Sequence, residues 1–168
     1  MGDQINQIQA SYDTKEDRIL LKFKTLNQSV FLAWMTRRYA KLLLPVLQGQ
    51  HPTSGQSLLE KRQHLEEQMK HQQATHSGDY SSAYEEPDTP EYPLGDEPIL
   101  LTQISFKNLN SDSPTFIMEP EHGAGLVLPY KGELLGPLLK IVAGAIKKAD
   151  WELETDSLLH LPEDSAVH

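Results

Sequence analysis

The chain has 168 residues, a formal net charge of −9 and no cysteine. Its length suits one sizeable domain or two small ones. The lack of cysteine excludes disulfides, thiolate metal sites and a cysteine nucleophile, and it fits a reducing cytoplasm. The printed sequence starts with neither a basic leader nor an apolar run, and no apolar stretch approaches the ~20 residues of a membrane helix. We therefore expect a cytoplasmic protein that does not engage a membrane.

The negative charge is concentrated in two segments. Residues 1–50 hold 7 basic and 4 acidic side chains, a net charge of +3, whereas residues 51–98 hold 3 and 10, a net charge of −7. Residues 99–150 hold 5 of each, and residues 151–168 hold 5 acidic and no basic side chains. The overall charge therefore says little about the partners of the parts expected to fold.

Alternating apolar and polar residues predict three antiparallel strands in the first 50 residues. These predicted strands are residues 5–12, 18–24 and 29–35. In the second strand Ile19, Leu21 and Phe23 share the face expected to point into the core. The third strand is apolar on both faces, which is typical of a central strand.

A helix is predicted directly after the third strand. Thr36 stands at the N-cap position and Gly49 at the position favoured at a helix C-terminus. The apolar residues between them follow the spacing of a buried helix face. They are Tyr39, Leu42, Leu43, Val46 and Leu47.

The same order of elements is predicted a second time. Strands are expected at residues 98–108, 114–121 and 126–130, followed by a helix at 131–150, and the string HGAG (122–125) is interpreted as a hairpin turn. The strings LLLPVL (42–47) and LLGPLL (134–139) also match at an offset of 92 residues. These observations favour an α+β fold built from two pseudo-symmetric β-β-β-α repeats, each with an antiparallel sheet covered by a helix. Because ~50 residues alone are marginal, the repeats are expected to share one core.

Five segments follow from this interpretation. They are a first β-β-β-α repeat at 1–50, an exposed connecting helix at 51–75, an acidic Pro/Ser-rich disordered linker at 76–98, a second β-β-β-α repeat at 99–152, and an acidic flexible tail at 153–168. The linker and tail are assigned as disordered because their composition cannot bury enough apolar surface.

Catalytic and metal-binding patterns are weak. His64 and His71, with Glu67 between them, could reach one divalent ion, but solvated residues on a polar helix are the favoured interpretation. The chain has no nucleophile elbow, phosphate-binding glycine loop or dinucleotide fingerprint. HGAGL (122–126) is explained more simply as a hairpin connection. We expect no enzymatic activity, no cofactor and no metal.

Two basic clusters are the candidate partner- or anion-binding residues. Arg37, Arg38 and Lys41 lie at the start of the first predicted helix, where the helix dipole disfavours cations, so a carboxylate or phosphate is expected to compensate them. Lys22 and Lys24 lie on the second strand. Long arginine side chains that simply cover apolar surface remain an equal alternative.

Single-stranded nucleic acid is the second class of partner. Basic residues around Tyr12, Phe23 and Trp34 resemble a surface on which bases stack and phosphates are neutralised. The parity of Phe23 argues against it, because Phe23 falls with the core residues and leaves no exposed stacking platform.

Three tyrosines punctuate the acidic linker. Tyr80, Tyr84 and Tyr92 could anchor a partner or fold back on a basic face of the same protein. Spacers in a solubilising loop are the alternative interpretation.

The stretch FLAWMTRRYAKLLLPVL (31–47), with INQIQ near the start, resembles a family of small uncharacterised bacterial proteins. In that family a strand runs into Thr-Arg-Arg-aromatic and a leucine-rich helix with proline. The resemblance covers about a third of the chain and implies a bacterial protein without a transferable activity. The strand and helix order is also similar, in outline, to Whirly-type single-strand binders, which use four strands per unit.

We therefore expect a non-enzymatic interaction or accessory protein of the bacterial cytoplasm. It would act on a protein partner through the face of Arg37 and Arg38 and through the acidic linker. A nucleic-acid-binding protein that uses the basic first repeat, modulated by the acidic linker and tail, is the alternative, and homodimerisation stays open.

Overall fold

The computed structural model of the protein describes residues 4–51, 80 and 83–153. Three predicted features lie wholly or largely outside the described residues. They are the connecting helix, the linker before residue 83 apart from Tyr80, and nearly all of the tail. His64 and His71 lie outside them as well.

The described elements belong to an α+β fold, which confirms the predicted class. In the first half they are β1 (Ile5–Asp13), β2 (Arg18–Thr25), β3 (Val30–Met35) and α1 (Arg37–Leu47). In the second half they are β4 (Ile99–Leu100), β5 (Gln103–Lys107), β6 (Thr115–Glu119), β7 (Leu126–Pro129) and α3 (Gly132–Ala149). Neither of the described helices is long and apolar enough to cross a bilayer.

A bulge reconciles the sequence of β1 with a single buried face. Strict alternation cannot place Ile5 and Ile8 on the same side of a strand, yet both are buried. The register with β2 shifts between Ile5 and Gln7, so one extra residue is accommodated there. From Ile8 onward the alternation is regular, and Phe23 lies in the core as its parity predicted.

Helix α1 begins and ends where its sequence predicts. The hydroxyl oxygen of Thr36 accepts a hydrogen bond from the backbone N–H of Tyr39 at 3.2 Å, which satisfies one of the free donors of the first turn. Gly49, just beyond the helix, has a φ of 83°, the left-handed conformation that glycine adopts without strain. Pro45 lies in the last turn of α1, whereas Pro137 lies in the second turn of α3.

The strands form one sheet of four strands and one of three. The first sheet has the order β1-β2-β3-β4 and the second the order β5-β6-β7. The stretch 98–108, predicted as one strand, is divided: β4 pairs in parallel with β3, through Ala33 with Ile99 and Trp34 with Leu100, whereas β5 belongs to the second sheet. The first sheet thus takes its fourth strand from the second half of the chain.

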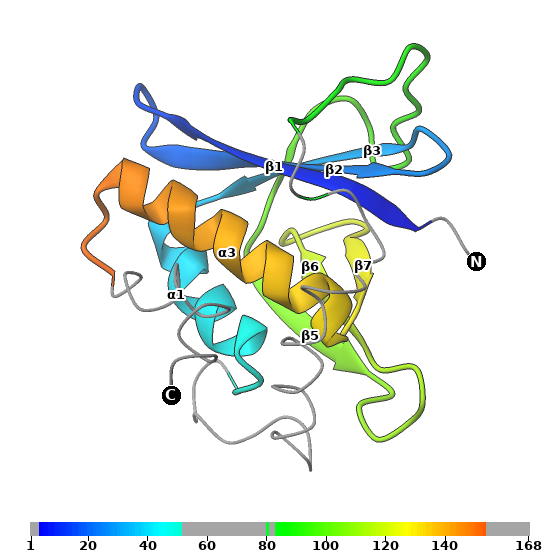
Figure 1. Cartoon of the computed structure of the whole chain (residues 1–168). Helices are drawn as coiled ribbons and strands as arrows, with labels where there is room; N and C mark the ends of the chain where they lie inside the picture. The colour runs from blue at the N-terminus through cyan, green and yellow to red at the C-terminus, as the bar shows by residue number, and fades with distance from the viewer. Residues whose placement is uncertain (1–3, 52–79, 81–82, 154–168) are drawn as a thin grey trace.

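The helices do not each cover the sheet of their own half. Helix α3 packs against β1 and β2, and α1 contacts β3, β5 and α3. Both helices lie on one side of the first sheet, and residues 83–91 of the acidic linker lie on the other side (Figure 1). The structure therefore does not confirm two pseudo-symmetric units, although the order of elements repeats along the chain.

One hydrophobic core joins the two halves. Buried residues of both sheets and both helices belong to a single cluster that includes Phe23, Leu43, Phe116 and Leu139. Two tyrosine hydroxyls strengthen the connection, because Tyr39 of α1 donates to the carbonyl of Gln103 at 3.0 Å and Tyr130 donates to the carbonyl of Val46 at 2.6 Å. These buried hydrogen bonds fix α1 against the second sheet from both ends.

Candidate functional site

The side of the first sheet that faces away from the helices carries its polar and basic side chains. We call it the outer face. Its residues alternate with the core residues along β1, β2 and β3 and continue onto β4. They are Gln7, Gln9, Ser11, Arg18, Leu20, Lys22, Lys24, Val30, Leu32, Trp34 and Leu100.

An acidic stretch of the linker crosses one end of the outer face. We call residues 83–91 the acidic segment; it contains four carboxylates and no cation. The side chain of Gln7 holds its backbone, because Nε2 donates to the carbonyl of Ala83 at 3.2 Å and Oε1 accepts from the N–H of Glu85 at 3.1 Å. At the other end Glu91 forms a parallel bridge with Ser29, and its carbonyl accepts from the N–H of Val30 at 2.7 Å.

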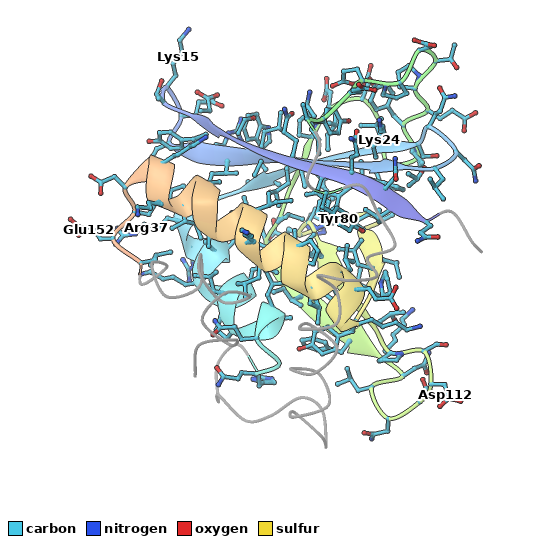
Figure 2. All side chains as sticks on the ribbon, viewed as in Figure 1. Lys15, Lys24, Arg37, Tyr80, Asp112 and Glu152 are labelled. Atoms are coloured by element: carbon cyan, nitrogen blue, oxygen red, sulfur yellow. The ribbon has the colours of Figure 1, made fainter. Side chains whose placement is uncertain are left out.

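The described part of the predicted linker, residues 83–98, contacts the folded core. Composition alone favoured disorder, but residues 83–98 gain contacts from a sheet whose strands lie more than 60 positions earlier in the sequence. These contacts cover the outer face at Gln7 and Val30, which are only 4% and 1% exposed. Figure 2 shows Lys24 directed toward this segment.

Tyr84 lies between the two lysines of β2. The ammonium groups of Lys22 and Lys24 are 5.7 and 5.6 Å from the centre of its ring, a cation–π arrangement. Lys22 also pairs with the carboxylate of Glu86 at 2.8 Å, and Lys24 donates to the carbonyl of Glu85 at 2.7 Å. Burial, with a smaller contribution from Glu86, raises the pKa of Tyr84 to about 12, so the phenol is neutral at physiological pH.

The hydroxyl of Tyr84 is buried and has no hydrogen-bond partner in the described part of the chain. A hydroxyl taken out of water without a partner loses stabilisation relative to a ring that has no polar atom. The aromatic ring of Tyr84 is therefore well placed on this surface, whereas its hydroxyl is buried at a cost in free energy.

The other end of the outer face is left uncovered by the acidic segment. There the guanidinium of Arg18 stacks over the ring of Trp34, 3.8 Å from its centre, and Arg18 also pairs with Glu16 of the preceding turn. Leu20 is the cross-strand neighbour of Trp34, and Leu100 on the other side is 45% exposed. This end is a small aromatic and apolar surface with one cation.

This surface was not predicted from the sequence. An exposed stacking platform was ruled out because Phe23 belongs to the core face, and Phe23 is indeed buried. In addition, β3 was expected to be apolar on both faces. Counting alternation from Met35, which is fully buried, would have placed Trp34 on the opposite side, next to Arg18.

Arg37, Arg38 and Lys41 are exposed, but they do not lie with Lys22 and Lys24. They belong to α1, on the helix side of the first sheet, and Figure 2 shows Arg37 on that side. The five candidate binding residues are thus divided between two faces, and only the two lysines belong to the outer face.

A carboxylate of the β1–β2 turn interacts electrostatically with Arg37. Asp17 Oδ1 accepts hydrogen bonds from the indole Nε1–H of Trp151 at 2.8 Å and from the hydroxyl of Tyr12 at 2.7 Å. The bond from Trp151 first, then that from Tyr12 and the charge of Arg37, lower the pKa of Asp17. Among the described residues, Asp17 of this turn is thus a carboxylate whose charge interacts favourably with Arg37.

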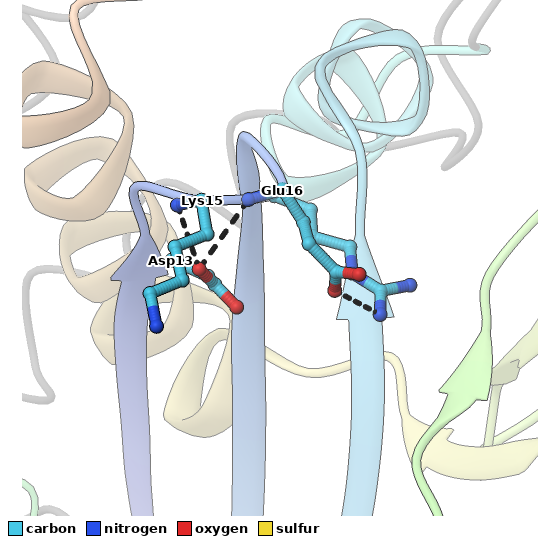
Figure 3. Close-up of polar contacts among 4 residues, drawn as sticks. Asp13, Lys15 and Glu16 are labelled. Carbon is cyan, nitrogen blue, oxygen red and sulfur yellow. Dashed lines mark hydrogen bonds and ion pairs between the residues drawn. The ribbon is translucent and has the colours of Figure 1, made fainter.

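The neighbouring residues of the same turn are ordered by a second carboxylate. Asp13 Oδ1 accepts from the backbone N–H groups of Lys15 at 2.9 Å and Glu16 at 3.4 Å, as Figure 3 shows. This arrangement is the side-chain-capped turn that aspartate favours. It positions Glu16 beside Arg18 at the uncovered end of the outer face.

The three linker tyrosines differ in placement. Tyr80 is partly buried against the core, and its hydroxyl donates to the carbonyl of Ile5 at 3.4 Å. Tyr84 is held between the two lysines, whereas Tyr92 is 37% exposed. Tyr80 and Tyr84 thus fold back on the protein itself.

A shallow depression lies beside the HGAG turn. Its volume is about 530 Å³, and Pro93, Leu94, His122 and Gly123 are among its lining residues. Gly123 has a φ of 101°, which agrees with the interpretation of HGAG as a hairpin connection. Within the described residues no three histidine or carboxylate side chains gather as a metal site would require.

Comparisons of the chain with protein-family models, with curated proteins and with solved structures find no match. The contacts of the outer face are therefore the ground on which a function can be proposed.

Proposed function

We propose that this chain is a non-enzymatic interaction protein of the bacterial cytoplasm that binds a protein partner through its outer face. The observation that carries the proposal is that a polypeptide segment already docks there, held by backbone hydrogen bonds, two lysines and an aromatic ring. A face that binds one extended acidic segment has the donors and cations needed to bind another.

The uncovered end of the outer face extends this surface. Trp34 and Arg18 belong to the residue types that contribute most to protein interfaces. The exposed side chain of Leu100 adds apolar area beside them. Arg37, Arg38 and Lys41 fall outside the proposed interface because they lie on the helix side of the sheet, with Asp17 near Arg37.

Site-specific photocrosslinking in cells that naturally make the protein tests the proposal. A photoreactive residue at Ser11, on the outer face, is expected to capture a discrete partner. The same residue at Val127, which is 59% exposed on β7, is the matched control and should capture none.

Charge-reversal variants complete this test. Lys22→Glu/Lys24→Glu should reduce the crosslink at Ser11 at least several-fold, whereas Arg37→Glu/Arg38→Glu should leave it unchanged. Equal capture at Ser11 and Val127, or loss of the crosslink only with the arginine variant, would contradict the proposed surface.

Single-stranded nucleic acid is the second candidate ligand. It is favoured by the position of Trp34, which lies on the outer face together with Arg18, Lys22 and Lys24. Two features oppose it: Arg18 already covers the ring of Trp34, and the acidic segment brings four carboxylates to the same face.

Anisotropy of a labelled oligothymidylate at low salt separates the two candidates. If nucleic acid is the ligand, deletion of residues 76–98 should strengthen binding, with a steep loss of affinity as salt is raised. No binding by either the full chain or the deletion variant at low salt would remove this candidate.

A further inference from the structure

We propose that the acidic segment is a displaceable intramolecular ligand, and that the partner competes for its place with an extended acidic segment in which an aromatic residue is followed by carboxylates. This inference rests on the proposed function, because it names the chemistry of the partner and the regulation of the same surface. It is carried by the way in which residues 83–91 contact the outer face.

The backbone of the acidic segment is recognised without regard to its sequence. The amide of Gln7 both donates to and accepts from the segment backbone, at Ala83 and Glu85, and Gln7 is itself 4% exposed. Lys24 likewise binds the backbone carbonyl of Glu85 and not its carboxylate. Any extended peptide that reaches this position can make the same three hydrogen bonds.

The side-chain contacts specify an aromatic residue and a carboxylate two positions later. The ring of Tyr84 fits between Lys22 and Lys24, and Glu86 pairs with Lys22. A segment with the pattern aromatic-x-acidic therefore satisfies both lysines at once. The surface around Trp34 and Arg18, which the acidic segment does not reach, leaves room for a longer partner segment to make its first contact.

The segment of the chain itself is an imperfect ligand. The buried hydroxyl of Tyr84 has no hydrogen-bond partner among the described residues, and the Lys22–Glu86 pair is partly exposed, with Glu86 52% accessible. An exposed ion pair contributes little to binding, and a buried hydroxyl without a partner weakens it. Covalent attachment compensates through a high effective concentration, so a tighter segment from a partner can still displace it.

Release would not require the core to open. The fixed end of the segment is the bridge of Glu91 to Ser29, followed by the chain that leads into β4. The contacts of Tyr84, Glu85 and Glu86 are all with outer-face side chains. The segment can therefore lift from Lys22 and Lys24 while β4 stays paired with β3.

A competition experiment on the full chain tests the inference. The probes are fluorescein-labelled peptides with the sequence of residues 83–91, AYEEPDTPE, and its phenylalanine form, AFEEPDTPE. The receptor variants are Tyr84→Ala/Glu86→Gln, which releases the segment, and Tyr92→Ala, a control at an exposed tyrosine outside it. Fluorescence anisotropy at low salt measures affinity, and circular dichroism checks that each variant is folded.

The release variant should bind the tyrosine probe at least tenfold more tightly than the unmodified chain, whereas Tyr92→Ala should not differ from it. The phenylalanine probe should bind on the order of tenfold more tightly than the tyrosine probe, because it buries no unpaired hydroxyl. Adding Lys22→Glu/Lys24→Glu to the release variant should abolish binding of both probes. Glu86→Gln alone, an exposed change, should give a smaller gain and serves if the double variant is unfolded.

Three outcomes would overturn the inference. The first is that the unmodified chain and the release variants bind the probes with equal affinity. The second is that light scattering shows the unmodified chain to be a stable dimer, in which two copies exchange the segment. The third is that the release variant binds oligothymidylate but not the peptides. If crosslinking at Ser11 persists while the probe affinities are equal, the proposed function stands and only the displacement is wrong. If crosslinking at Ser11 fails as well, both fail.

Discussion

At the scale of single residues, Asp17 connects three parts of the chain. Its carboxylate accepts from Tyr12 of β1 and from Trp151 beyond α3, and its pKa is lowered by these bonds and by the charge of Arg37. Its φ of 54° is left-handed, a conformation that aspartate and asparagine tolerate better than most residues. The same side chain thus shapes the turn and attaches the end of α3 to it.

Replacement Asp17→Asn should destabilise the protein at neutral pH and much less in acid. A carboxylate whose pKa is lowered on folding stabilises the folded state above its ordinary pKa of ~3.9, and that stabilisation is lost as the pH falls through the lowered value. Asparagine keeps the backbone conformation but does not titrate. Urea midpoints of both proteins should therefore differ more at pH 7 than at pH 3. A difference that stays constant or widens in acid would show that the charge of Asp17 has no such role.

At the scale of elements, β4 decides how the two halves are joined. It has two residues, too few to carry a pattern of its own, yet it extends the first sheet and directs the next strand into the second sheet. The N–H of Leu101 donates to the carbonyl of Trp34 at 3.0 Å, and the Leu101 side chain is 2% exposed. Leu100, immediately before it, points to the outer face.

Alanine substitutions at these adjacent leucines should have very different effects. Leu101→Ala should lower the free energy of unfolding by about 2–5 kcal/mol, because it leaves a cavity in the shared core. Leu100→Ala should cost less than about 1 kcal/mol, because the side chain is 45% exposed. Urea denaturation of the pair measures both. Equal losses would contradict the placement of β4 in the first sheet.

At the scale of the whole molecule, the shared core predicts a single cooperative unit. Helix α3 covers β1 and β2, and α1 contacts β5, so neither half has a complete core without the other. Domains of this size with one core usually unfold in one step. The two tryptophans, Trp34 in the first half and Trp151 in the second, are natural reporters of each half.

Single-tryptophan variants should therefore show coincident unfolding. In Trp34→Phe only Trp151 reports, and in Trp151→Phe only Trp34 reports. Within each variant, the fluorescence midpoint should agree with the midpoint from circular dichroism in the same urea titration. A fluorescence transition separated from the loss of secondary structure would indicate that the halves unfold independently.

Local features of the chain were predictable because they depend on neighbours in sequence. The alternation of Ile19, Leu21 and Phe23 set the faces of β2, the hydroxyl of Thr36 capped α1, and glycine formed the turn at 122–125. Each rests on a backbone preference or a contact within a few residues. Two of the three basic residues of the outer face, Lys22 and Lys24, were named as candidates for the same reason, whereas Arg18 was not.

The acidic segment shows what composition does not contain. Residues 83–91 carry too few apolar side chains to fold alone, so disorder was predicted. Their order depends on Gln7, Lys22 and Lys24, which lie far away in the sequence. The position of Trp34 on the outer face was not predicted, because an apolar strand does not reveal which of its faces is covered by helices.

The sequence by itself determined the class of the fold, the order of most of its elements and the face that β2 turns to the core. These follow from periodicity and caps, which act over a few residues. Only the tertiary structure decided that β4 joins the first sheet, that α3 covers β1 and β2, and that the acidic segment lies on the outer face. Such choices depend on the summed packing and pairing of residues remote in sequence, which no local pattern contains.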